Sequence, residues 1–336
     1  MTRFFDGAYL EKYVNADIAL AAMRTCFDAE ADGTTVLPPR VDVPSGRGFI
    51  RVMPAVLDDV MGLKVMTLVE GLGTRYLVML YDVSTGALLA LFDADELTRI
   101  RTAAVTALAG LAMTEGPPAS IGIIGTGFEA VGHLRMLAHV WPLEHVIVFS
   151  PNAARRHRFA QAMASELSIS VVAAESEEEA LRDQPVVVLA TKAKTPVIDG
   201  AHLRAGAVVL SIGSTRLDLR ELDATSLRRA SLVVADDPHM VRLESADIAE
   251  TIASGILDPA HIMALSALRR EHRRPSTRPD GDIEIFKSVG TALQDLSLAR
   301  ALYHDPVVRS GSLELPDLSR LKPFAAKAFD GVQTPA

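Results

Sequence analysis

Residues 121–130 have the sequence Ile-Gly-Ile-Ile-Gly-Thr-Gly-Phe-Glu-Ala, a glycine turn that follows an apolar run and precedes a helix-forming stretch. In this G-x-G-x-x-A pattern, Gly125 permits the tight bend and Gly127 lets a pyrophosphate approach the backbone. The small side chain of Ala130 keeps the following helix close to the sheet, and the N-terminus of that helix faces the anion. The pattern predicts a dinucleotide site formed by Gly125, Thr126, Gly127, Phe128, Glu129 and Ala130.

The segment around this turn alternates between strands and helices. Glu115-Gly116-Pro117-Pro118 is the clearest break in the chain. After it, strands are expected at 119–124, 145–149, 169–173, 186–190 and 207–212, and helices at 127–140, 153–167 and 177–182. The unbroken run Val186-Val187-Val188-Leu189 is typical of a strand buried on both faces of a parallel sheet. A glycine turn can join a strand to a helix without any ligand, but this α/β rhythm favours a Rossmann domain over residues 116–285.

The first part of the chain has a different pattern. A helix is expected over residues 5–30, because apolar residues recur there at helical spacing. Short β-prone runs at 41–43, 48–53, 63–69, 75–81 and 87–92 predict an antiparallel meander, followed by a helix from Asp95. A last helix is expected over 285–303, packed back on the first part. The predicted fold is therefore a discontinuous α+β domain, residues 1–115 plus 286–336, into which the Rossmann domain is inserted.

The end of the second Rossmann strand bears on which dinucleotide is bound. An Asp or Glu at this point would hold the ribose hydroxyls of NAD. The strand instead ends Phe149-Ser150-Pro151-Asn152 and is followed by Arg155 and Arg156, with no acid. Ser150, Asn152 and an arginine such as Arg155 could bind a 2′-phosphate, so NADP is favoured. NAD stays an alternative, because both arginines could instead form a solvated helix face.

Composition narrows the classes of function. The 336 residues include 34 Lys and Arg against 42 Asp and Glu, a net charge of −8, which argues against a protein that neutralises nucleic-acid phosphates. The basic run Arg269–Arg274 lacks interleaved aromatic residues and is interpreted as a solvated loop. Cys26 is the single cysteine, and no histidine spacing typical of a metal site occurs, so no metal is expected. No secretory leader or membrane-spanning segment is recognised, which favours a soluble, cytoplasmic protein without nucleic-acid or membrane partners.

Three charged residues of the first part stand in otherwise apolar surroundings. Arg40 follows Pro38-Pro39 at the head of a strand, Lys64 lies within a β-prone run, and Arg101 lies within an apolar helix. An arginine fork binds a carboxylate through two hydrogen bonds, and a half-buried lysine can exchange protons because burial lowers its pKa. Taken singly, each could also be a surface charge or part of a structural ion pair. Their spacing in sequence does not show that they converge.

Four blocks of the sequence resemble the ornithine cyclodeaminase/mu-crystallin family. They are Arg-Thr-Ala-Ala-Val at 101–105, Ile-Ile-Gly-Thr-Gly-Phe-Glu-Ala at 123–130, Ile-Gly-Ser-Thr-Arg-Leu-Asp-Leu-Arg-Glu-Leu-Asp at 212–223 and Phe-Lys-Ser-Val-Gly at 286–290. The likeness is collinear over nearly the whole chain and is more specific than the glycine turn alone. The family fold, a discontinuous substrate and dimerisation domain that carries a Rossmann domain, agrees with the architecture predicted above.

The resemblance implies roles for individual residues. Arg40 and Arg101 match two arginines that bind the substrate carboxylate, and Lys64 matches a lysine beside the reacting carbon. Ser288, in the last block, is expected to contact the cofactor. The loop Asp that cyclodeaminases use corresponds to Thr215 here. The chain therefore looks more like the mu-crystallin branch of ketimine reductases, with Thr215 lining the substrate pocket.

This branch implies NAD(P)H-dependent reduction of cyclic ketimine carboxylates, Δ1-pyrroline-2-carboxylate and Δ1-piperideine-2-carboxylate, to proline and pipecolate. Arg40 and Arg101 would hold the carboxylate while hydride reaches the carbon of the protonated C=N bond. Lys64 would stabilise or supply the proton, with a water as the alternative source. The sequence does not choose between five- and six-membered rings.

Two other functions stay open at this point. One is an ornithine cyclodeaminase or an alanine-type amino-acid dehydrogenase, and the other is a non-catalytic, mu-crystallin-like binding protein. The family is dimeric, and a meander leaves strand edges that need cover, so a homodimer is expected.

Overall fold

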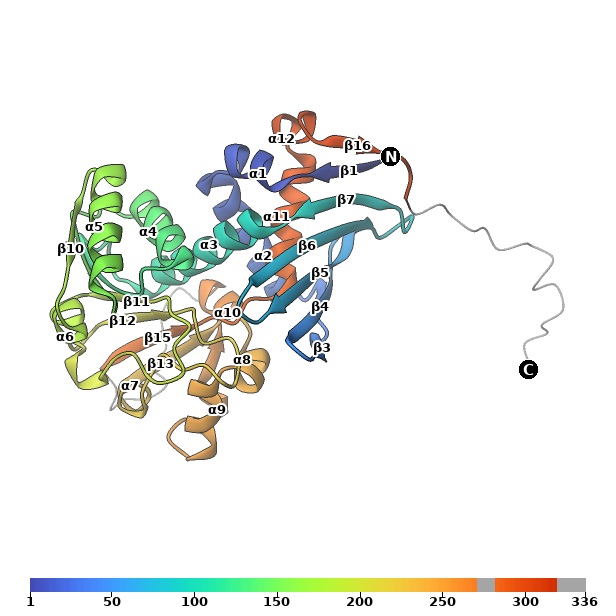
Figure 1. Cartoon of the computed structure of the whole chain (residues 1–336). Coiled ribbons are helices and arrows are strands. Elements are labelled where there is room, and N and C mark those ends of the chain that lie inside the picture. The colour runs from blue at the N-terminus through green and yellow to red at the C-terminus, as the bar shows by residue number, and fades with distance from the viewer. Residues whose placement is uncertain (271–281, 319–336) are drawn as a thin grey trace, which may run out of the picture.

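A computed structural model of the chain describes residues 1–270 and 282–318. They form two eight-stranded sheets with their helices, and helix α3 (Asp95–Met113) runs between the sheets (Figure 1). The expected solvated loop at 269–274 falls mostly outside the described residues, as does the C-terminal stretch 319–336 of the predicted first domain. In the described part, no helix has both the length and the apolarity needed to cross a membrane.

The first sheet contains the predicted meander. Its strands lie in the order β16-β1-β7-β6-β5-β4-β2, and β3 also pairs with β4. Neighbouring strands are antiparallel except for β1 and β7. Lys64 is opposite both Met53 and Val78, so these three side chains share one face. The strands are β1 (Thr2–Phe5), β2 (Thr35–Val36), β3 (Val41–Ser45), β4 (Gly48–Leu57), β5 (Val60–Val69), β6 (Gly73–Asp82), β7 (Leu88–Asp93) and β16 (Leu313–Leu315).

Two of the predicted helices differ from the observed ones by more than one residue at an end. The helix expected over 5–30 is divided into α1 (Gly7–Tyr13) and α2 (Ala16–Asp32), because the side chains of Asp6 and Asn15 cap two separate helices. The helix expected over 285–303 begins only at Ala292, as α11 (Ala292–His304), and ends at His304. Its first residues belong to strand β15 (Ile283–Lys287), where the alternating Ile283 and Ile285, followed by Phe286, favour a strand that pairs in the second sheet. Helix α12 (Pro306–Ser310) follows α11.

The second sheet is parallel throughout. Its order is β10-β9-β8-β11-β12-β15-β13-β14, so the chain switches sides between β8 and β11. This doubly wound order confirms the predicted Rossmann fold, in which ligands bind at the switch point. The strands are β8 (Ser120–Ile124), β9 (His145–Phe149), β10 (Ser170–Ala173), β11 (Val186–Leu189), β12 (Val208–Ser211), β13 (Ala230–Ala235), β14 (Ile262–Ala264) and β15. The helices are α4 (Phe128–Val140), α5 (Ala153–Leu167), α6 (Glu177–Leu181), α7 (Ala224–Arg229), α8 (Pro238–Glu244), α9 (Ala246–Ala253) and α10 (Leu265–Arg270).

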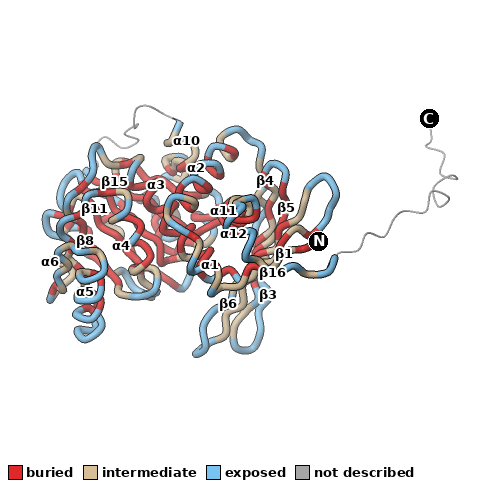
Figure 2. The backbone as a smooth tube through the Cα atoms, turned by 90° about the horizontal axis from the view of Figure 1, so that it is seen from above, coloured by how far each residue is buried: buried red, intermediate tan, exposed pale blue. Residues whose placement is uncertain are grey.

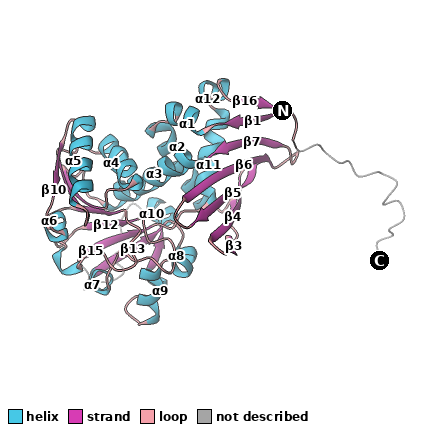
Figure 3. Ribbon diagram, in the orientation of Figure 1, coloured by secondary structure: helices cyan, strands magenta, loops and turns pink. Residues whose placement is uncertain are grey.

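The second sheet is buried on both faces, as the run at 186–189 predicts. Val186 and Val188 face a core shared with α3, α4, α5 and the first sheet, whereas Val187 and Leu189 face a separate core under α6 to α9. Figure 3 shows α4 and α5 on one side of this sheet and α7 and α9 on the other. Buried residues continue through α3 toward the first sheet (Figure 2). The shared core therefore holds the two sheets in a defined relation.

The predicted domain boundary at residue 286 falls inside β15, which is a strand of the second sheet. We propose to place the boundary after Lys287. On this division the first domain comprises residues 1–115 and, among the described residues, 288–318. Helix α11 returns to cover the first sheet by packing on β4, β5 and β6.

Candidate active site

Two adjoining cavities lie where the two sheets meet. The larger, of about 840 Å³, surrounds the glycine turn at the carboxyl ends of β8, β9 and β11, and we call it the turn cavity. The smaller, of about 490 Å³, lies between β4 to β6, α3 and the loop after β12, and we call it the cationic cavity. The residues that line both cavities are Thr74, Tyr76, Thr98, Glu129 and Lys192. A molecule bound in one cavity can therefore approach a molecule bound in the other.

The glycine turn leaves room for an anion at the start of α4. Gly125 has a φ of +118°, and a Cβ there would lie 2.4 Å from the carbonyl oxygen of Ala190. A Cβ at Gly127 would meet no atom within 4 Å, so the space beside the turn is open. Helix α4 begins at Phe128 with Gly127 as its N-cap and no capping side chain, which leaves N–H groups of the first turn for a ligand. The turn therefore fits the pyrophosphate of a dinucleotide.

The residues predicted to bind the cofactor fall into three groups. Those that line the turn cavity are Gly125, Thr126, Gly127, Phe128, Glu129, Ser150, Asn152 and Arg155. Ala130 is fully buried and is not among the lining residues, which agrees with a packing role between helix and sheet. Ser288 lines the cationic cavity instead, and its hydroxyl donates to Asp236 Oδ2 at 2.7 Å.

The end of β9 offers hydroxyl, amide and guanidinium groups to a ligand. Ser150 Oγ lies 3.0 Å from Thr126 Oγ1, and the Asn152 side chain accepts a hydrogen bond from the Arg155 N–H at the start of α5. Arg156 is buried and pairs with Glu175, so it is committed elsewhere. The acids that line the turn cavity are Asp95 and Glu129, and neither lies at the end of β9.

Lys64, Arg101 and Asp295 form a buried cluster in the wall of the cationic cavity. Asp295 Oδ1 accepts hydrogen bonds from Lys64 Nζ at 3.0 Å and from Arg101 Nε at 2.9 Å. Arg101 Nη1 also donates to Gln294 Oε1 at 2.8 Å. A Cβ at Gly290, where φ is +74°, would lie 2.9 Å from Arg101 Nη1, so glycine at this position makes room for the guanidinium. Strand β5, α3 and α11 thus bring two cations to one carboxylate.

Lys64 is tuned by its surroundings. Burial lowers its pKa to about 8; Asp295 opposes this shift, and the positive charge of Arg101 adds to it. The ammonium also lies 4.6 Å from the centroid of the Tyr76 ring, which favours the charged form. Lys64 is therefore mainly protonated at neutral pH but loses its proton at a lower pH than an exposed lysine.

Arg40 and Thr215 complete the set of residues predicted to bind substrate. Arg40 donates from Nε to Glu244 on α8, and its Nη2 lies 3.5 Å from the carbonyl oxygen of Val289. Burial lowers the pKa of Arg40 and raises that of Glu244. Thr215 lies in the loop after β12. The structure brings Arg40, Lys64, Arg101 and Thr215 together in the lining of the cationic cavity.

The cationic cavity has an excess of positive charge. Its lining includes two acids, Glu70 and Glu129. The cations that line it are Arg40, Arg51, Lys64, Arg101, Lys192, Lys194 and Arg216. Five of these cations are paired with four acids outside the lining, Glu244, Asp42, Asp295 and Asp218, so the positive excess is small, but it still favours an anionic ligand.

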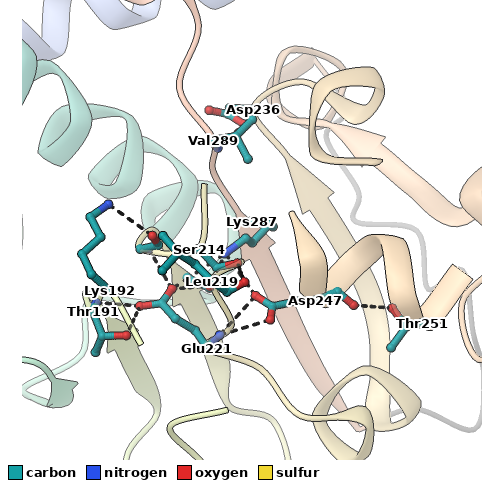
Figure 4. A network of polar contacts seen from close by, with 12 residues as sticks. Thr191, Lys192, Ser214, Leu219, Glu221, Asp236, Asp247, Thr251, Lys287 and Val289 are labelled. Atoms are coloured by element: carbon teal, nitrogen blue, oxygen red, sulfur yellow. Dashed lines mark hydrogen bonds and ion pairs between the residues drawn. The ribbon is translucent and has the colours of Figure 1, made fainter. Parts of the chain in front are cut away.

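A buried polar network supports the floor between β11 and β12 (Figure 4). Glu221 accepts hydrogen bonds from the Thr191 N–H at 2.7 Å, from the Gly213 N–H at 2.7 Å and from Ser211 Oγ at 2.8 Å. Lys287 Nζ donates to Ser211 Oγ at 2.8 Å and lies 3.4 Å from Asp247 Oδ2 and 3.7 Å from Glu221 Oε2. Burial raises the pKa of Asp247, which the Lys287 charge opposes. The network fixes Thr191 and Gly213, which both line the turn cavity.

Sequence reasoning did not identify Asp295, Asp236 or Glu221 as parts of the site. Asp295 stands in the apolar stretch 292–299, and a carboxylate in such a helix is a signal for a buried cation partner. Asp236 follows the apolar strand β13 and accepts hydrogen bonds from Ser288 and from the N–H groups of Val289 and Gly290. An acid at the carboxyl end of a buried parallel strand indicates a position at the binding edge of the sheet, and Asp236 has this pattern in the sequence. Among the described residues, no group of His, Cys, Asp and Glu could hold a metal ion.

Comparison with known proteins supports the architecture. The model of the ornithine cyclodeaminase/mu-crystallin family matches residues 8–309. The chain is 32% identical over 304 residues to the Δ1-pyrroline-2-carboxylate/Δ1-piperideine-2-carboxylate reductase of Azospirillum brasilense, a match that covers 88% of this chain and 93% of the relative. It is 30% identical over 301 residues to the ketimine reductase mu-crystallin of Mus musculus, with 84% and 90% covered.

A solved structure is similar over nearly the whole chain. The Δ1-pyrroline-2-carboxylate reductase of Thermococcus litoralis, determined in complex with NADH and L-proline, superimposes with a TM-score of 0.86 at 28% identity. The match covers 94% of this chain and all of the other. Both the Rossmann sheet and the meander are therefore present in an arrangement already observed in a solved protein.

Proposed function

Because the chain belongs to the ornithine cyclodeaminase/mu-crystallin family, we propose that it reduces cyclic ketimine carboxylates with a nicotinamide dinucleotide. The substrates are Δ1-pyrroline-2-carboxylate and Δ1-piperideine-2-carboxylate, and the products are proline and pipecolate. The names of the relatives and the NADH and proline bound to the Thermococcus protein support this assignment. The observation that carries it is the meeting of the turn cavity with a cavity lined by Lys64 and Arg101.

In the proposed mechanism the cationic cavity binds the substrate carboxylate. Arg101 donates hydrogen bonds from Nε to Asp295 and from Nη1 to Gln294, which hold the guanidinium in place. Its Nη2 then faces the substrate. Lys64 uses one of its three N–H donors on Asp295, so the other two can reach the ligand. Arg40, which pairs with Glu244, lines the same cavity. The carboxylate is thereby oriented so that the C=N bond lies toward the turn cavity.

Lys64 is also the candidate for handling the proton of the C=N nitrogen. With a pKa of about 8 it is a stronger acid than an exposed lysine, so proton transfer to an imine is less unfavourable. A bound nicotinamide would supply the hydride. By the family resemblance, Thr215 corresponds to the loop Asp of cyclodeaminases, and a hydroxyl cannot take the place of that carboxylate as a base. The residues present therefore favour imine reduction over cyclodeamination.

The turn cavity would hold the dinucleotide. Gly125, Thr126, Gly127 and Phe128 surround the open space at the N-terminus of α4, which suits the pyrophosphate. Ser150, Asn152 and Arg155 lie at the end of β9, where the adenosine ribose is held in a Rossmann domain. A guanidinium with two hydrogen-bonding side chains and no acid at that place favours a 2′-phosphate. We therefore infer a preference for NADPH over NADH.

Activity assays with three kinds of substrate separate the candidate functions. The purified protein is incubated with NADPH or NADH and Δ1-pyrroline-2-carboxylate, and the absorbance of the reduced cofactor is followed. Oxidation of the cofactor that depends on the imine supports the proposal. Ammonia released from ornithine, or oxidation of alanine, would instead indicate a cyclodeaminase or an amino-acid dehydrogenase. If the protein turns over no imine and no amino acid, the non-catalytic binding function is the alternative that remains.

We also propose that the protein is a cytoplasmic homodimer. The face of the first sheet opposite Lys64 carries a half-buried apolar patch formed by Val52, Leu63, Val65, Leu77 and Met79. A second copy of this patch would bury it from water, which is favourable by about 25 cal/mol per Å² of apolar surface. Light scattering should give twice the mass of one chain, and Val65→Asp should give the mass of a monomer.

A further inference from the structure

The proposed substrate carries charges of both signs, but the cationic cavity suits only one of them. Its ring carboxylate is negative, whereas the protonated C=N nitrogen is positive. The excess of lysine and arginine that attracts the carboxylate also disfavours the protonated nitrogen. The reactive, protonated form therefore needs a negative group beside the nitrogen, at the place where the two cavities meet.

Glu129 is the acid at that place. The turn cavity is lined by the acids Asp95 and Glu129 and the cationic cavity by Glu70 and Glu129, so within residues 1–270 and 282–318 Glu129 alone lines both. It belongs to the first turn of α4, and its side chain is 30% exposed. The glycine pattern assigns Glu129 to the cofactor site, but its position is shared with the substrate side.

The carboxylate of Glu129 is not committed to another cation. Glu129 Oε2 is buried and makes no hydrogen bond to any described residue. His133 Nδ1 lies 3.9 Å from this oxygen, but it lies 2.7 Å from the backbone oxygen of Glu129, to which it donates. Burial lowers the pKa of His133, so the imidazole is neutral at pH 7. Burial lowers the pKa values of Lys64 and Lys192, and the charge of Glu129 partly opposes that shift in both.

We propose that Glu129 is a catalytic residue whose carboxylate faces the protonated ring nitrogen of the cyclic imine. This inference rests on the proposed function. The negative charge stabilises the iminium relative to the neutral imine, and the iminium carbon is the better hydride acceptor. When hydride forms the new C–H bond, the π electron pair of the C=N bond moves to nitrogen and the nicotinamide is oxidised. The resulting amine takes a proton from water, and Glu129 pairs with the ammonium until the product leaves.

The test is Glu129→Gln, which keeps the size of the side chain and removes its charge. We expect kcat/KM for Δ1-pyrroline-2-carboxylate to fall about 100-fold or more, while the Kd for NADPH, measured by fluorescence, changes less than about threefold. Glu129→Asp should recover at least about tenfold of the loss, because it restores the charge. The primary isotope effect with NADPH deuterated at the transferred position should rise in Glu129→Gln, because hydride transfer becomes slower. The control is Glu11→Gln, an exposed residue of α1 outside both cavities.

Three results would overturn the proposal. The first is a kcat/KM for Glu129→Gln within about threefold of the wild-type value. The second is an equal loss of NADPH affinity, which would make Glu129 a cofactor contact only. The third is a fall in melting temperature that accounts for the lost activity and that Glu129→Asp shares. If the wild-type protein itself reduces no cyclic imine, the proposed function fails, and that assay shows it before any variant is measured.

Discussion

Asp295 controls the charge state of Lys64, and the substitution Asp295→Asn tests that control. In the folded protein Asp295 is fully buried, and its Oδ1 accepts from Lys64 Nζ at 3.0 Å and from Arg101 Nε at 2.9 Å. Burial lowers the pKa of Lys64 to about 8, and the Asp295 charge is the main effect that opposes burial. Removal of that charge should lower the pKa of Lys64 further, because burial and Arg101 then act without opposition.

The expected shift can be estimated from Coulomb's law. Two unit charges 3.0 Å apart interact by about 5 kcal/mol at an effective dielectric constant near 20, which is roughly four pKa units. Entry of water and the remaining hydrogen bond to the Asn amide oxygen reduce this effect. One quarter of it still moves the Lys64 pKa from about 8 to about 7. Protonated Lys64 would then be lost within the neutral range.

The assay is the pH dependence of kcat/KM for Δ1-pyrroline-2-carboxylate, from about pH 5.5 to about pH 9.5. Activity that needs protonated Lys64 should decline above pH 8 in the wild-type protein and about one unit lower in Asp295→Asn. Ionisation of the substrate contributes equally to both profiles, so the difference between them reports on the protein. Asp59→Asn is the matched control, because Asp59 also pairs with α11, through Arg300 at 2.6 Å, but at the surface. An alkaline limb that stays in place in Asp295→Asn would refute the reasoning.

Three further predictions follow from the same contacts. Arg101→Ala should lower kcat/KM for the imine by about 10²- to 10³-fold, while the NADPH affinity measured by fluorescence titration stays unchanged. An equal loss of kcat/KM and of NADPH affinity would show that Arg101 touches the nucleotide or supports the fold. Arg155→Ala should weaken NADPH binding about tenfold and leave NADH binding nearly unchanged. A titration in which the binding of both cofactors weakens equally would contradict a contact between Arg155 and the 2′-phosphate. Lys287→Met should reduce the free energy of unfolding, measured in urea, by about 3–5 kcal/mol, because it leaves Glu221 and Asp247 buried without a cation. A loss below about 1 kcal/mol would contradict this and would mean that the two carboxyl groups become protonated in the variant.

The sequence alone determined the features that depend on local patterns. The glycine turn, the strand and helix rhythm after Pro118 and the meander at 41–92 all follow from residue spacing and turn residues, and the structure reproduces them. These patterns are local because backbone geometry and alternate burial act over a few residues. The division at Asn15 and the strand at Ile283–Lys287 were missed for the same reason. A capping residue within an apolar helical pattern and a short apolar run both leave the local pattern ambiguous. Pairing with the distant strands β12 and β13 decides the second case.

The tertiary structure decided what the charged residues do. Arg40, Lys64 and Arg101 are far apart in sequence, and the shared core between the sheets brings them to one cavity. The sequence could name Lys64 as a candidate, but the carboxylate that tunes it lies 231 positions away, on α11. The position of Glu129 at the junction of the two cavities was equally invisible, because it depends on how the Rossmann sheet meets the meander. Electrostatic interactions act through space, and distances between side chains from different elements exist only after the chain has folded.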